Sequence, residues 1–143
     1  MKKFWTIIIV LVWAGCSPQA STNQVCFKGQ CVDVEIVQKA PDLQRGLQFR
    51  KSLGEKNGML FVFPKADRYS FWMKDTLIPL DMIWIDYART IVYIAQGVPP
   101  CQSDPCPVYT PTGSALYVLE VNAGYAERLG LKEGVEVEFR LRE

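Results

Sequence analysis

The chain has 143 residues, with 16 lysine and arginine side chains against 15 aspartate and glutamate side chains, and no histidine. The near-neutral balance, a formal net charge of +1, gives no reason to expect a nucleic-acid partner. The absence of histidine excludes Ser-His-Asp and Cys-His catalysis and the histidine-containing zinc sites, so we expect no metal and no cofactor.

Residues 1–15 are typical of a secretory signal. Lys2 and Lys3 precede an apolar run over residues 4–12, which is far shorter than the ~20 residues needed to cross a bilayer. Cys16 follows an Ala-Gly pair, as in bacterial lipoprotein signals, where that cysteine is lipidated and becomes the mature N-terminus. We therefore predict a lipoprotein-type signal peptide over residues 1–15. The protein would be exported to the bacterial cell envelope and attached to a membrane by lipidated Cys16, on the periplasmic side or at the outer surface.

Two alternatives are an ordinary cleaved signal and an uncleaved N-terminal anchor with a free Cys16. The lipoprotein is favoured because an unpaired thiol is unusual in an exported chain. Residues 16–24 are small, polar and uncharged, which predicts a tether, and residues 25–143 are expected to form one β-rich domain. Without the two lysines of the signal, 14 basic side chains remain against 15 acidic ones, a net charge of −1.

Four further cysteines follow, in two copies of a Cys-x4-Cys spacing. An even number in an exported chain predicts disulfides, here the local pairs Cys26–Cys31 and Cys101–Cys106. A two-residue turn at Lys28-Gly29 would place the first pair directly opposite across a hairpin, at ~4.5 Å between Cα atoms, whereas a three-residue bulged loop would shift this register. The second pair would close a proline-rich loop. The alternative is a four-cysteine metal site, which an oxidising compartment disfavours.

Strand patterns dominate the rest of the chain. Alternating apolar and acidic residues over 32–36 and 135–142 predict strands with one solvent-exposed face. Residues 59–63 are apolar without alternation and stop at Pro64, which predicts a strand buried on both faces. Further short strands are expected at residues 69–74, 80–86, 90–96 and 115–121.

Two short helices are predicted. One covers residues 41–45, with proline at its start and Gly46 weakening its continuation. The other covers residues 122–130, capped by Asn122 and ended by Gly130. About seven to eight short strands with so little helix predict a mainly β fold, a small, barrel-like, strongly bent antiparallel sheet.

The densest group of unusual residues runs over positions 71–86. Lys74 and Asp75 stand at the end of an aromatic strand, and Asp81 lies inside an apolar run. A carboxylate buried there must be paired or hydrogen-bonded, and Lys74 and two nearby arginines are the available cations. One interpretation is an internal ion pair or a loop-capping aspartate. The other is a ligand-binding polar cluster with Trp72 as its apolar wall.

The two arginines form a second cluster, residues 45–50. Arg45 and Arg50 could hold a carboxylate or a phosphate in a fork, while a solvated helix end is the alternative. Neither cluster supplies a nucleophile–base pair. Glycoside hydrolysis would need two carboxylates facing each other across ~5–9 Å, and the candidates are Asp75, Asp81 and Asp86.

Six segments match a known family in order and spacing: RGLQFR (45–50), GMLFVF (58–63), FWMKDT (71–76), PLD (79–81), VPPC (98–101) and VLEVNAG (118–124). They resemble the motifs of the domain of unknown function 192 family, over about residues 32–139. That family usually carries Met at the position of Gln48 and Asn at the position of Asp75. The resemblance implies a compact β-rich domain, often exported or lipid-anchored, and brings no established activity. It strengthens the expectation that one site contains Arg45, Trp72, Lys74 and Asp81.

We predict a domain that binds a small or extended ligand without catalysis, using Arg45, Arg50, Trp72, Lys74, Asp75 and Asp81. The alternatives are a carboxylate- and lysine-dependent envelope hydrolase, and a structural accessory of an envelope protein complex. The expected partners are a membrane, through the lipid anchor, and a small molecule or an envelope protein, with the chain itself monomeric. A pocket with two carboxylates at hydrolytic separation would favour the enzyme, and one carboxylate would favour binding.

Overall fold

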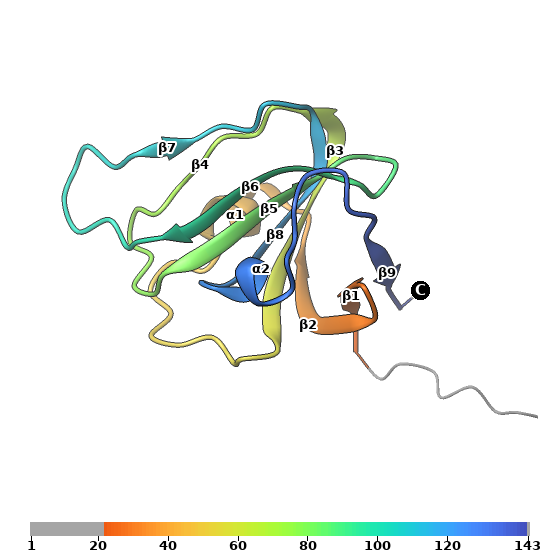
Figure 1. The fold of residues 1–143 in the computed structure, drawn as a ribbon. Helices are drawn as coiled ribbons and strands as arrows, with labels where there is room; N and C mark the ends of the chain where they lie inside the picture. The colour runs from red at the N-terminus through yellow and green to blue at the C-terminus, as the bar shows by residue number, and fades with distance from the viewer. Residues whose placement is uncertain (1–21, 143) are drawn as a thin grey trace, which may run out of the picture.

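The computed structural model describes residues 22–142, and the predicted signal peptide and Cys16 lie outside them. The described chain is mainly β, as predicted, with one strongly curled sheet of seven strands in the order β6-β5-β8-β3-β2-β1-β9 (Figure 1). These strands are β1 (Gln24–Phe27), β2 (Gln30–Val37), β3 (Asn57–Asp67), β5 (Leu80–Ile85), β6 (Ile91–Val98), β8 (Ala115–Asn122) and β9 (Glu138–Arg140). A small second sheet pairs β4 (Phe71–Trp72) with β7 (Val108–Tyr109).

One strand pair departs from the predicted antiparallel sheet. β2 and β3 run parallel, with Asp33 opposite Asn57 and Val37 opposite Phe61. Parallel neighbours need a long crossover connection, because the chain must return to the same end of the sheet. Here that connection contains α1 (Ala40–Arg45) and the loop after it. The crossover therefore lays the Arg45 segment across one face of the sheet.

The sheet separates two hydrophobic clusters because neighbouring side chains of a strand point to opposite faces. Leu60, Ile83 and Leu119 belong to one cluster, which α2 (Tyr125–Arg128) covers. Phe61 and Met82 belong to the other, which lies on the side of α1. Every residue of β5 is buried, so this strand is the centre of the molecule.

Two predicted strands have different ends in the structure. β3 does not stop at Pro64 but continues to Asp67, with a register irregularity after Val62 that accommodates the proline. The strand predicted at residues 135–142 divides between two partners. The amide of Ile91 donates to Val135 and that of Val137 to the carbonyl of Arg89, while only β9 itself pairs with β1. This division draws the two edges of the curled sheet toward each other.

The second helix is shorter than the predicted range of 122–130, and Asn122 does not cap it. Its N-cap is Gly124, which has no side chain to cap the helix, and the amide of Ala126 in the first turn donates instead to Asp81 Oδ2 at 2.8 Å. Asn122 is instead the last residue of β8, and its Nδ2 donates to the carbonyls of Leu53 and Gly54 at 3.1 and 3.0 Å. The side chain therefore holds the long β2–β3 crossover against the sheet.

Both predicted disulfides are present. Cys26 lies directly opposite Cys31, with Cα atoms 4.0 Å apart, and Cys101 is bonded to Cys106. Lys28 and Gly29 both have positive φ, 49° and 81°, so the hairpin has the two-residue turn whose twist matches its strands. Disulfides persist in oxidising compartments, which indicates an extracellular or periplasmic location. Within residues 22–142, no helix is long and apolar enough to cross a membrane.

The predicted tether ends earlier than residue 24. Asp33 Oδ1 accepts hydrogen bonds from Thr22 Oγ1 at 2.6 Å and from Gln24 Nε2 at 2.8 Å. Asn23 Oδ1 accepts from the amide of Arg142 at 2.8 Å. Residues 22–24 therefore belong to the folded domain and hold both ends of the described chain beside each other.

Replacing both Cys101 and Cys106 with serine should loosen the proline-rich loop more than it destabilises the fold. A short closed loop restricts the unfolded chain only modestly, so the expected loss is near the low end of the ~2–4 kcal/mol range. Hydrogen exchange should accelerate most in residues 99–107, while the melting temperature should fall by roughly 5–10 °C. Equal acceleration throughout the central strands would contradict this local role.

Candidate ligand-binding pocket

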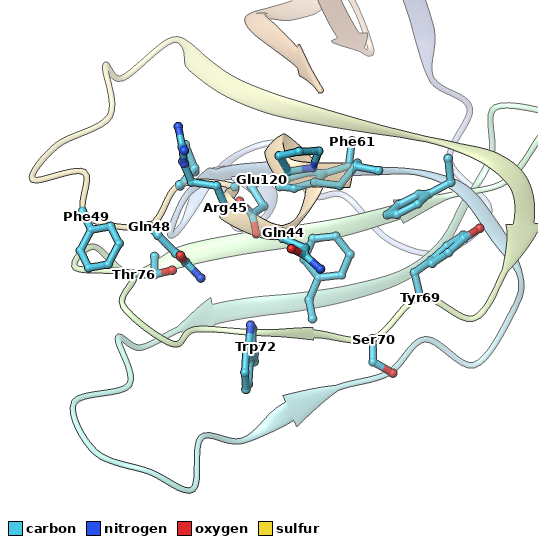
Figure 2. Close-up of a pocket in the computed structure, with 16 residues that line it drawn as sticks. Gln44, Arg45, Gln48, Phe49, Phe61, Tyr69, Ser70, Trp72, Thr76 and Glu120 are labelled. Carbon is cyan, nitrogen blue, oxygen red and sulfur yellow. The ribbon is translucent and has the colours of Figure 1, made fainter. Parts of the chain in front are cut away.

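A pocket of about 660 Å³ lies between α1 with its following loop and the aromatic side chains of β3 and β4. Figure 2 shows Gln44, Arg45 and Gln48 on the α1 side and Trp72 on the β4 side. The pocket exists because the β2–β3 crossover and the β4 strand extend beyond the central sheet and enclose space above its face. Its lining includes Leu43, Leu47, Phe49, Phe61, Phe63, Tyr69, Ser70, Phe71, Thr76 and Glu120.

The aromatic wall of the pocket is held in a fixed arrangement. Phe63 and Tyr69 stack with ring centroids 3.6 Å apart, and Phe71 meets the Phe61 ring edge-to-face at 5.0 Å. Behind them the fully buried Trp84 packs against Phe71 at 5.6 Å and donates its indole N–H to the carbonyl of Tyr69 at 2.8 Å. Such edge-to-face pairs fix ring orientation, so this wall is formed before any ligand enters.

Gly46 brings the backbone close to the bottom of the pocket. It has a φ of 48°, and a Cβ at this position would lie 3.1 Å from Phe61 Cζ and 3.8 Å from Glu120 Oε2. A side chain would therefore be strained and would press on Phe61. The glycine of the Arg45-Gly46 pair is required for this close approach.

The loop after Gly46 is tied to the end of β4. Phe49 has a φ of 64°, and its amide donates to the carbonyl of Asp75 at 2.8 Å. Asp75 also has positive φ, 57°, which asparagine and aspartate tolerate better than most residues. Asp75 therefore serves the backbone turn. Phe49 and Trp72, 65% and 49% exposed, flank the pocket opening.

Glu120 is the one carboxylate in the pocket lining. It lies on β8 between Met59 of β3 and Met82 of β5 in register, so its strand neighbours offer no charge. The residue is 5% exposed, and its buried Oε2 has no hydrogen-bond partner within residues 22–142. Burial away from water disfavours the charged form and raises the pKa of Glu120 to about 8. The carboxyl is consequently protonated at neutral pH, and an unpartnered buried polar group of this kind costs about 1–3 kcal/mol.

Of the predicted site residues, the structure brings Arg45 and Trp72 together in the pocket lining. The other four lie outside that lining, and Asp81 is described separately below. Arg50 forms a bidentate pair with Glu35 at 2.5 and 2.6 Å, which lowers the pKa of Glu35 and raises the pKa of Arg50. Lys74 Nζ pairs with Asp104 Oδ2 at 3.0 Å, which raises the pKa of Lys74. Asp75 is the third, in the turn described above.

Of the alternatives for Asp81, the ion pair with a nearby cation is not the one that the structure shows, since no ion pair in residues 22–142 includes it. Asp81 is completely buried, and its two oxygens accept hydrogen bonds from backbone amides, Oδ1 from Gly97 at 2.7 Å and Oδ2 from Ala126 at 2.8 Å. It neighbours Met82 on β5 and so points to the opposite face, toward α2. These hydrogen bonds to backbone amides agree with the other interpretation, a capping aspartate. Asp81 joins β6, β5 and α2 and takes no part in the pocket.

The sequence interpretation missed Glu120, Gln44 and Gln48 as pocket residues. The sequence did contain a signal for Glu120, because this residue is a single carboxylate inside the otherwise apolar run 115–121. Asp81 stands in the same way inside the apolar run 80–85. Gln48 also replaces the methionine usual in the resembled family, and it places an amide in the lining. Within residues 22–142, no three histidine, cysteine, aspartate or glutamate side chains cluster as metal ligands would.

The family comparison agrees with this architecture. The family described as DUF192, Uncharacterized ACR, COG1430, matches residues 23–139. The chain belongs to this family. Nothing in the family description assigns an activity to its members. No curated protein matches the chain.

Two solved structures are similar to this DUF192 protein. One is a protein of unknown function from Novosphingobium aromaticivorans, 35% identical over 81% of this chain and 82% of that chain, with a TM-score of 0.73. The other is described as a putative transcription regulator from Sinorhizobium meliloti, 31% identical over 83% of this chain and 93% of that chain, with a TM-score of 0.73. These matches support the fold and bring no established function.

Proposed function

We propose that this protein is an envelope-anchored binding domain, and that the pocket between α1 and β4 holds a small or extended ligand. The observation that carries the proposal is the pocket itself. It combines a preformed aromatic wall with a few polar groups, including one deeply buried carboxyl group, and this composition is typical of small-ligand sites.

The number of carboxylates favours binding over hydrolysis. Glycoside hydrolysis needs two carboxyl groups facing each other, and the lining contains Glu120 alone. Asp75, Asp81 and Asp86, the predicted candidates for such chemistry, all lie outside the lining. Asp75 lies in a turn, and Asp81 and Asp86 accept hydrogen bonds from backbone amides. Lys74 is occupied by Asp104 and lies outside the lining.

Ligand retention tests the binding proposal. The protein purified from its own envelope should carry a bound molecule in native mass spectrometry, and Trp72→Ala should lose it. Because Trp72 is half-exposed, the same change should alter the free energy of unfolding by less than about 1 kcal/mol. Tyr87→Ala is the matched control, an exposed aromatic residue outside the pocket lining. If Trp72→Ala and Tyr87→Ala retain the bound molecule equally, or if the wild type carries no bound molecule, the proposal is contradicted.

Anchoring through Cys16 gives a separate prediction. A diacylated or triacylated cysteine attaches stably to a membrane, whereas one acyl chain binds only marginally. Cys16→Ala should therefore move the protein from the membrane fraction to the soluble fraction after a carbonate wash. Its melting temperature should be unchanged, because the described fold begins after this residue. A variant that remains in the washed membrane would refute lipid anchoring.

A further inference from the structure

The chemistry of the pocket's lining points to the kind of ligand it takes, and this inference rests on the proposed binding function. Glu120 is the deepest polar group in the lining, 5% exposed, and its Oε2 lacks a hydrogen-bond partner within the described chain. Buried carboxyl groups in proteins are normally paired or hydrogen-bonded. A ligand that donates a hydrogen bond to this oxygen would supply what the protein does not.

Among the described residues, 22–142, no side chain forms an ion pair with Glu120. The titratable residues of the lining besides Glu120 are Arg45 and Tyr69. Arg45 is exposed, and in residues 22–142 no ion pair includes it or Glu120. The residues opposite Glu120 on the neighbouring strands are Met59 and Met82. The pKa of Glu120 is accordingly raised by burial alone, with no charged neighbour contributing.

The rings around Glu120 favour a positively charged partner. A Cβ at Gly46 would lie 3.1 Å from Phe61 Cζ and 3.8 Å from Glu120 Oε2, so the Phe61 ring lies near the carboxyl group. Phe71 meets Phe61 edge-to-face, and the half-exposed Trp72 also lines the pocket. Aromatic faces attract ammonium groups through their negative quadrupole, most strongly where water is excluded. Apart from Arg45, which is exposed, the rest of the lining is apolar or carries uncharged amides and hydroxyls, which suits an apolar ligand body.

We propose that the pocket binds a primary ammonium group carried on an apolar or aromatic body, with Glu120 as its counter-ion and hydrogen-bond acceptor. The ammonium N–H groups would donate to the carboxylate, and the rings would surround the charge. Since the free carboxyl is protonated at neutral pH, the pocket would release its proton to solvent as the cation enters.

This proposal predicts a specific pH dependence. With a free pKa of about 8, ligand binding at pH 7 should release about 0.9 proton per site. The affinity for an alkylammonium ion, which stays charged throughout, should rise by about fifty-fold between pH 6 and pH 8. Burial raises the pKa of Tyr69 above its ordinary value, so this residue does not titrate in the same range.

Isothermal titration calorimetry with 2-phenylethylamine and 2-phenylethanol tests this proposal. Repeating each titration in buffers of different ionisation enthalpy gives the number of protons released on binding. The two probes share the same phenylethyl body, and each can donate a hydrogen bond, but only the amine carries a positive charge. At pH 8 the wild type should bind the amine at least tenfold more tightly than it binds the alcohol. At pH 7 it should release a proton as the amine binds. Glu120→Gln should lose both the preference and the proton release, while Glu127→Gln, which changes an exposed glutamate of α2, should keep them.

Equal binding of the alcohol, or binding of the amine without proton release, would overturn the ammonium proposal, as would failure of both probes to bind. Retention of a native ligand in mass spectrometry does not depend on these probes. A protein that retains an uncharged native ligand would therefore refute the ammonium class while the binding function stands.

Discussion

Replacing Glu120 with glutamine should raise the free energy of unfolding at pH 8 by about 3–5 kcal/mol. The folded-state pKa of about 8 lies far above the ordinary value of 4.5, so the folded protein binds a proton that the unfolded chain releases. Stability from this group is fully present below pH 4.5 and is lost as the pH rises toward 8. Glutamine keeps the shape of the neutral acid and cannot ionise.

Urea unfolding at pH 4.5, 6 and 8 would measure this effect, with the disulfides kept oxidised. The advantage of Glu120→Gln should be near zero at pH 4.5 and should grow steadily to pH 8. Glu133→Gln, which changes an exposed carboxylate, is the control and should follow the wild type. If the free energy of unfolding of the Glu120 variant also equals that of the wild type at all three pH values, Glu120 is solvated or paired. The description of Glu120 as a buried, unpartnered carboxyl group would then be wrong.

Replacing Asp81 with alanine should lower the free energy of unfolding by about 3–5 kcal/mol, because hydrogen bonds to a carboxylate contribute about 1.5–3 kcal/mol each. The change removes both of its bonds and leaves the amides of Gly97 and Ala126 without these acceptors. β6 and α2 should loosen together, since Asp81 joins them. Amide exchange at these two positions would report that loosening.

Asp104→Ala is the matched control for Asp81. Asp104 also forms a bond through its carboxylate, to Lys74, but both partners are well exposed. An exposed pair of this kind contributes little to stability, because water and salt screen the two charges. Equal stability of the two variants would show that the buried bonds of Asp81 are not what fixes α2 on the sheet.

The sequence was most informative where local geometry decides the structure. The Cys26–Cys31 hairpin needs only a two-residue turn and an alternating strand, both of which are visible in consecutive residues. The division of residues 135–142 between two partners was not visible, because it depends on where the chain near Arg89 lies in space. Likewise, the parallel pairing of β2 with β3 depends on a crossover whose path no local pattern specifies.

The binding site was predicted only in part, because some of its contacts also depend on the path of the chain in space. Arg45 and Trp72 were predicted from their local residue clusters, the resemblance strengthened that prediction, and both line the pocket. Asp81 was misplaced because its partners are backbone amides 16 and 45 residues away. Every residue except proline has a backbone amide, so the sequence does not show which amides will bond to a carboxylate. Glu120 and Asp81 occupy similar apolar runs, and only the folded sheet shows that they point to opposite faces.

A crystal structure of the protein purified from its own envelope, without added ligand, would test the central claim most directly. We expect electron density for a bound molecule between Trp72 and Gln44, with a polar atom within hydrogen-bond distance of Glu120 Oε2. An empty pocket, or a bound molecule elsewhere on the protein, would contradict the assignment of this pocket as the binding site.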